Sequence, residues 1–139
     1  SAWVSRSGEE PGAVSLTVLE ASSADVQEDV RERTRHIMAS LMGKPGFLSV
    51  LVAAVGRRMY AISAWRSPDD VALLRDSPHA ETVRWFFAND VAIGAQTGVW
   101  TPHRLNGMWI RCDACGEMVQ GANGRCEAGH ELPAAPAYW

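Results

Sequence analysis

A run of mostly apolar residues from Phe47 to Val55 constrains the fold of this chain more than any other feature. The run is too short for a stable helix and is bounded by Gly46 and Gly56, which favours a buried strand. Gly56 and the residue after it are typical of a tight turn, and an extended pattern resumes from Met59 to Trp65. We therefore predict an antiparallel hairpin in the middle of a sheet.

Strands are also expected on either side of this hairpin. In residues 13–20 one face carries Val14, Leu16 and Val18, and the other carries Ser15, Thr17 and Leu19. Strict alternation of this kind is typical of a half-buried strand. The last long strand is predicted over residues 94–101, where alternate positions are again apolar.

Two helices are predicted between these strands. The first begins near Asp25, with Glu28 completing a capping box, and ends at Gly43. The second begins at residues 67–70, Ser-Pro-Asp-Asp, because proline and carboxylates suit the first turn of a helix. It is interrupted near Ser77-Pro78 and resumes as far as Phe87.

The order strand, helix, strand, strand, helix, strand predicts an α+β, ferredoxin-like βαββαβ domain over residues 13–107. Residues 1–12 are expected to form a flexible arm, and residues 108–139 a zinc-ribbon-like extension with an aromatic tail. Two helices cover only one face of such a sheet. Because the other face is also apolar, a homodimer that buries it against a second copy is expected.

The composition excludes several kinds of partner. The chain of 139 residues has a formal charge of −3 and a pI near 5.8. It lacks the clustered basic residues that bind phosphates, so we expect no nucleic-acid partner. No apolar run approaches the length of about 18 residues that a membrane span needs, and the first residues do not resemble a signal peptide. A cytoplasmic protein without membrane contact is expected.

The strongest chemical signal is a set of cysteines and a histidine near the C-terminus. Cys112 and Cys115 form one knuckle, and Cys126 and His130 form a second. Three thiolates and one imidazole complete a tetrahedral shell for Zn²⁺ with no open position, which is the pattern of a structural site. So short a segment has almost no core, and metal binding would supply most of its folding energy.

Two other interpretations of these residues remain open. Cys112 and Cys115 could form a redox pair, although the residues that follow do not indicate the helix that such pairs need. The zinc could instead be catalytic, with water in place of His130 or with His103 as an alternative ligand.

Two histidines are candidates for proton transfer. His79 shares one side of the second helix with Val83 and Phe86, which could direct its imidazole into a cavity. His103 follows the last strand. The alternatives are a helix-start histidine bonded to nearby backbone and a surface residue. Trp65 and Trp100 could line a pocket for a flat aromatic substrate or pack in the core.

Several local segments resemble a known superfamily. Residues 45–47, Pro-Gly-Phe, enter the central strand, residues 61–70 lead from a strand into the second helix, and residues 77–79 are Ser-Pro-His. Over residues 12–104 the chain resembles the dimeric α+β barrel superfamily, and most of all its antibiotic biosynthesis monooxygenase branch. Members include cofactor-independent oxygenases of aromatic polyketides, haem-degrading enzymes and polyketide cyclases.

The resemblance implies a cofactor-independent monooxygenase of secondary metabolism that acts on an aromatic or polyketide-like small molecule. His79 would be the base, with His103 as a second candidate, and Trp65 and Trp100 would be pocket walls. Arg66 or Arg104 would face the developing oxyanion. The alternatives are a polyketide cyclase or isomerase, and a non-catalytic module that binds a ligand or a partner.

Haem degradation is disfavoured. The positions that match the histidine and the tryptophan of the haem-degrading members hold Arg84 and Leu74. The sequence has no glycine-rich motif for a nicotinamide or flavin cofactor. Zn²⁺ in a structural role is the only cofactor expected.

Overall fold

The computed structural model describes residues 2–5, 9–72 and 78–137. The chain divides into two compact units, the first ending at Pro102 and the second covering His103–Ala137. Our sequence-based boundary lay at residues 107 and 108. Within the described residues, no helix combines the length and the apolar character needed to cross a membrane. The expected aromatic tip, Tyr138 and Trp139, lies outside the described residues.

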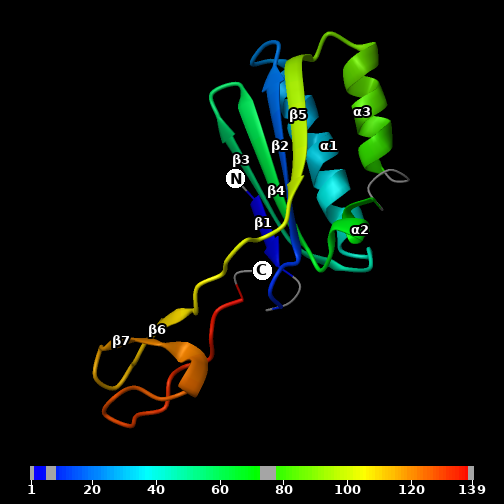
Figure 1. Cartoon of the computed structure of the whole chain (residues 1–139). Coiled ribbons are helices and arrows are strands. Elements are labelled where there is room, and N and C mark those ends of the chain that lie inside the picture. The colour runs from blue at the N-terminus through cyan, green and yellow to red at the C-terminus, as the bar shows by residue number, and fades with distance from the viewer. Residues whose placement is uncertain (1, 6–8, 73–77, 138–139) are drawn as a thin grey trace. The chain divides into compact units, whose positions relative to one another are not determined.

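The first unit is a single antiparallel sheet with helices on one face (Figure 1). Its elements are β1 (Ala2–Ser5), β2 (Ala13–Ala21), α1 (Val26–Leu41), β3 (Phe47–Val55), β4 (Arg58–Trp65), α2 (Pro68–Val71), α3 (Pro78–Ala88) and β5 (Ala92–Trp100). The strand order is β1-β3-β4-β2-β5. Without β1 this is the order of a ferredoxin-like sheet, so the predicted fold class is confirmed.

The first strand differs from the expected flexible arm. Residues 2–5 form β1, which pairs antiparallel with residues 49–52 of β3. Without this strand, β3 would be an edge strand, and its unpaired backbone groups would be open to further pairing. The strand β1 therefore depends on pairing with the edge of β3, and short-range sequence patterns do not reveal such pairing.

Local signals explain the other elements. Gly56 adopts a φ of 58° at the turn between β3 and β4, a conformation that glycine reaches without strain. Ser67 caps α2 through its hydroxyl, which accepts a hydrogen bond from the backbone N–H of Asp70. The capping box predicted at Asp25 is wrong, because the backbone of this N-cap residue has helical angles and its side chain makes no cap bond. The predicted interruption before Pro78 falls in residues 73–77, which lie outside the described part of the chain.

The core lies between the sheet and the helices. Trp65 is 0% exposed and meets Phe47 edge to face, with ring centroids 5.4 Å apart. Met38 and Leu41 of α1 pack against them. The two long helices also contact each other, and the guanidinium carbon of Arg33 on α1 lies 3.9 Å from the centroid of the Trp85 ring on α3. This cation–π contact joins the two helices.

In β2 the more polar face points toward the helices, which is the reverse of the usual arrangement in which the apolar face covers the core. Ser15, Thr17 and Leu19 face the helices, and the more apolar face lies on the outside of the sheet. The outer face also exposes Leu51 (40%), Ile62 (37%) and Trp100 (53%). An apolar second face was predicted, and the structure confirms it.

The second unit is small. Its strands are β6 (Trp109–Arg111) and β7 (Met118–Gln120), which pair antiparallel, followed by the short helix η2 (Gly121–Asn123). Gly116 and Gly129 have φ values of 75° and 84°. Gly116 directly follows Cys115 and Gly129 directly precedes His130, and each lets the backbone curl beside a predicted metal ligand.

Candidate active-site cavity and metal centre

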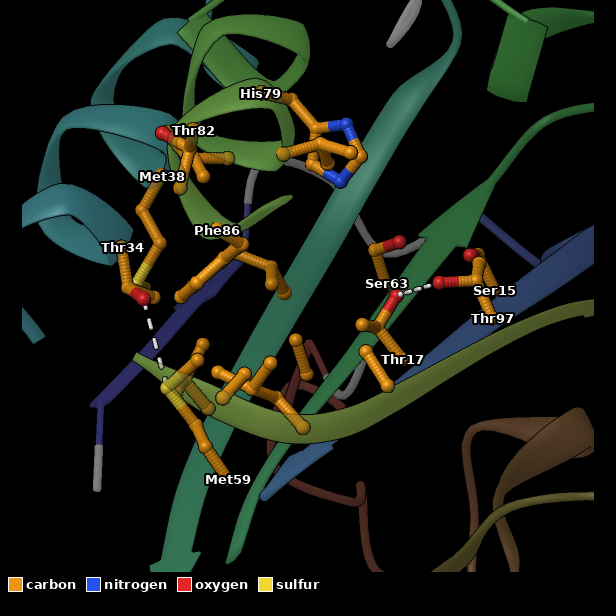
Figure 2. A pocket seen from close by; sticks show the side chains of 18 of the residues that line it. Ser15, Thr17, Thr34, Met38, Met59, Ser63, His79, Thr82, Phe86 and Thr97 are labelled. Atoms are coloured by element: carbon orange, nitrogen blue, oxygen red, sulfur yellow. Dashed lines mark hydrogen bonds between the residues drawn. The ribbon is translucent and has the colours of Figure 1, made fainter. Parts of the chain in front are cut away.

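A cavity of about 480 Å³ lies between the sheet and the helices of the first unit. This volume is within the range of small-molecule sites. Its walls come from α1, α3 and the strands β2 to β5, and Figure 2 shows His79 on α3 together with the polar side chains of the strands. Among the described residues that line the cavity, His79 is the only one with an ionisable side chain. The cavity therefore suits an uncharged, largely apolar molecule.

His79 is half-buried near the start of α3. Burial lowers the pKa of its imidazole below the ordinary value of 6.5, because removing water disfavours the charged form. The imidazole is accordingly neutral at pH 7, and in this state it can accept a proton. The predicted orientation beside Val83 and Phe86 agrees with the structure, since all of these residues line the cavity.

Sequence reasoning missed the hydroxyl groups on the sheet side of the cavity. They belong to Ser15, Thr17, Ser63 and Thr97 (Figure 2). Thr17 and Thr97 bond to each other, with their Oγ1 atoms 2.9 Å apart. The alternation of β2 contained this signal, because it places Ser15 and Thr17 on one face. It did not show which face the helices cover.

The structure does not place the other predicted site residues in this cavity. Trp65 lies in the core and is not one of the lining residues; its Nε1–H donates to the Ser63 hydroxyl at 2.8 Å. Trp100 lies on the outer face of the sheet, opposite Val14. The Arg66 guanidinium makes two bonds of 3.0 Å to the Glu9 carboxylate at the surface. This pairing lowers the pKa of Glu9 and raises that of Arg66.

His103 and Arg104, the remaining candidates, fall in the second unit. Both are exposed. Of the predicted catalytic set, only His79 lines the cavity.

The predicted metal ligands converge in the second unit. Cys112, Cys115, Cys126 and His130 each offer one ligand atom, and these atoms lie within 4.8 Å of one another. The Cys115 and Cys126 sulfurs are 3.8 Å apart, and His130 Nδ1 lies 3.4 Å from Cys126 Sγ and 3.8 Å from Cys112 Sγ. In a tetrahedral zinc site, bond lengths of about 2.3 Å to sulfur and about 2.0 Å to nitrogen place the ligand atoms about 3.5–3.8 Å apart. The donor set and the spacing fit Zn²⁺.

The surroundings of the cluster suit metal ligation. The backbone N–H groups of Cys115 and Ala114 bond to the Cys112 sulfur and lower the pKa of this thiol, which favours the thiolate that a metal needs. Arg111 and Arg125 donate to the carbonyl oxygens of Gly116 and Gly129 and tie down both knuckles. Among the described residues, His103 is not part of the cluster.

Comparisons with known proteins define the class of fold. The first unit has the ferredoxin-like fold of proteins related to antibiotic biosynthesis monooxygenases, here followed by a Cys₃His cluster compatible with a zinc-ribbon-like extension. No family model matches the sequence. No curated protein matches it at a significant level.

Three solved structures illustrate the similarity. A candidate antibiotic biosynthesis monooxygenase from Deinococcus radiodurans has a TM-score of 0.61 and 15% identity, covering 69% of this chain and 97% of its own. A monooxygenase from the gene ActVA-Orf6 of Streptomyces coelicolor, solved with nanaomycin D, has a TM-score of 0.57 and 20% identity, covering 69% and 91%. The cofactor-independent oxygenase SnoaB of Streptomyces nogalater has a TM-score of 0.54 and 15% identity, covering 67% and 94%.

Proposed function

We propose that this protein is a cofactor-independent monooxygenase of secondary metabolism whose substrate is an uncharged aromatic or polyketide-like molecule. The observation that carries the proposal is the cavity itself: its described lining residues are uncharged apart from His79, whose lowered pKa keeps the imidazole neutral. Two proteins of the same fold support it, since one is described as a cofactor-independent oxygenase and the other was solved with nanaomycin D.

Without a redox cofactor, the electrons that reduce O₂ must come from the substrate itself. His79 removes a proton from an activated C–H bond, and the resulting carbanion is delocalised into the aromatic system. The carbanion transfers an electron to O₂, and the two radicals combine to form a carbon–oxygen bond. Loss of water from the peroxide leaves a ketone. In sum, a CH₂ group and O₂ become C=O and H₂O, so no external reductant is consumed.

The remaining parts of the proposal concern assembly and location. A homodimer that buries the outer sheet face would cover Leu51, Ile62 and Trp100, which are exposed in the single chain. Zn²⁺ held by Cys112, Cys115, Cys126 and His130 has a structural role. A cytoplasmic location agrees with this ligand set, since thiols stay reduced there.

The test uses anthrone, a three-ring ketone with an activated CH₂ group. Oxygen uptake and anthraquinone formation are measured with the purified protein and corrected for the spontaneous reaction. His79→Gln should lower the rate about 10²- to 10⁴-fold, the usual contribution of a general base. His36→Gln, a change at an exposed histidine of α1, is the matched control, and His103→Gln tests the second candidate.

Each result distinguishes the alternatives. Consumption of anthrone-like substrates without oxygen uptake would favour a cyclase or isomerase. Equal rates for the wild type, His79→Gln and His103→Gln would contradict the catalytic proposal and favour a non-catalytic binding module.

A further inference from the structure

The cavity contains hydroxyl groups of two kinds. Those on the helices already have protein acceptors: Thr34 Oγ1 lies 2.7 Å from the carbonyl oxygen of Val30 and 3.5 Å from the Met59 sulfur on β4, and Thr82 Oγ1 donates to the carbonyl of Pro78 at 2.9 Å. Such bonds leave the helical hydroxyls no hydrogen to offer a ligand. The hydroxyls on the strands are arranged differently.

Ser15 and Ser63 sit directly opposite each other on the neighbouring strands β2 and β4. A directly opposed pair on one face of a sheet has its Cβ atoms about 4.5–5.5 Å apart, so both hydroxyls can reach one ligand atom. Both side chains face the cavity (Figure 2). Ser15 is 3% exposed and Ser63 is 8% exposed. They form a compact polar spot on an apolar floor.

The hydrogen-bond pattern leaves the hydroxyls of Ser15 and Ser63 free to donate to a ligand. The indole Nε1–H of Trp65 can only donate, so the Ser63 oxygen accepts at 2.8 Å and the hydroxyl hydrogen of Ser63 remains available. The Ser15 hydroxyl has no hydrogen-bond partner among the described residues. Among the described residues no fully buried side-chain nitrogen or oxygen lacks a partner, so the Ser15 oxygen is open to the cavity, where a ligand can bond to it.

We propose that Ser15 and Ser63 together bind the carbonyl oxygen of an uncharged aromatic ketone, with Trp65 as a positioning residue that keeps the Ser63 hydroxyl directed at this oxygen. The inference rests on the proposed function, and it narrows the substrate to a ketone whose oxygen lies on the strand side of the cavity. The same two donors would stabilise the enolate oxygen that forms when His79 removes the proton. This assigns to two neutral hydroxyls the role that sequence reasoning gave to Arg66 or Arg104.

A pair of unreactive probes separates this inference from the reaction. Xanthone and xanthene share a flat three-ring skeleton and differ in having C=O or CH₂ at one position, and neither requires turnover. Equilibrium dialysis measures both dissociation constants for the wild type, Ser15→Ala, Ser63→Ala and Trp65→Phe. Ser49→Ala is the matched control, because Ser49 is a buried serine of the same sheet that does not line the cavity.

The wild type should bind xanthone more tightly than xanthene. Loss of one neutral hydrogen bond should weaken xanthone binding about 3- to 10-fold in each serine variant. Xanthene binding should stay within about 2-fold of the wild type, because the apolar contacts are retained. Trp65→Phe should follow the serine variants in this selectivity, whereas a purely structural role of the indole would affect both probes equally.

Three outcomes decide whether the two serines bind the ketone. A wild type without preference for xanthone overturns the inference, and so does a preference that survives the change of both serines. Ser49→Ala must match the wild type, and thermal unfolding of each variant confirms that it is folded. If xanthone selectivity depends on the serines while anthrone is not oxidised, the ketone site stands and the oxygenase proposal fails.

Discussion

Removal of the metal ligands should unfold the second unit and leave the first intact. Among the residues of this unit whose burial is described, the buried apolar side chains are Ile110, Cys112 and Cys126. Burial of one isoleucine contributes about 1.5–3 kcal/mol, and ordering a single residue already costs about 1–2 kcal/mol of backbone entropy. Apolar burial is therefore far too small to fold the unit. A structural zinc contributes about 10–16 kcal/mol, which is the required magnitude.

The perturbation is Cys126→Ala, compared with Asp113→Asn as an exposed change within the first knuckle. Elemental analysis should find about one zinc per chain in the wild type and in the control, and little in Cys126→Ala, because the ligand set of four is broken. In amide NMR spectra the signals of the second unit should collapse to random-coil positions, and those of the sheet should persist.

The reasoning is refuted if Cys126→Ala keeps dispersed signals in the second unit. It is also refuted if wild-type protein purified without added zinc contains less than half an equivalent of metal. Unfolding of the sheet together with the second unit would show instead that the two depend on each other.

Three further predictions follow from the first unit. Because burial lowers the pKa of His79 below the ordinary 6.5, the rate of anthrone oxidation should fall on the acid side with a midpoint below pH 6.5, and a midpoint above that pH would contradict this. Ile62→Lys on the outer sheet face should give a monomer by light scattering, whereas the exposed change Ala39→Lys should leave the dimer; a monomeric wild type would contradict the dimer proposal. Gly46→Ala should destabilise the domain by about 1–2 kcal/mol in urea, since φ is 71° and the new Cβ would meet a neighbouring carboxylate, whereas Gly43→Ala has space; equal midpoints would refute the argument.

Local patterns were sufficient for most of the fold. The hairpin of β3 and β4 follows from one apolar run and Gly56, and α2 follows from its Ser-Pro-Asp-Asp start. The strand β1 could not be found in this way, because a strand of four residues exists only through the edge that β3 offers it. The metal ligands were predictable, since their spacing in the sequence reflects the geometry of one ion.

The cavity was harder to predict. Periodicity shows that Ser15 and Thr17 share a face, but it cannot show that helices rather than a second sheet cover that face. Trp65 was expected as a wall because tryptophans favour aromatic ligands, yet it is fully buried in the core against Met38 and Leu41 and bonds to the cavity-lining Ser63. Arg66 was expected to bind an anion and is instead engaged by Glu9, a pairing between distant parts of the chain.

The contact between Arg33 and Trp85 has a consequence for how molecules enter and leave. It fastens α1 to α3 across the side of the cavity that the helices form. A movement that parts these helices must break it, at a cost of about 0.5–2 kcal/mol, because both side chains are half-buried. A contact of this strength can break by thermal motion and still favours the closed arrangement of the helices, which would keep the carbanion of the proposed reaction from bulk water.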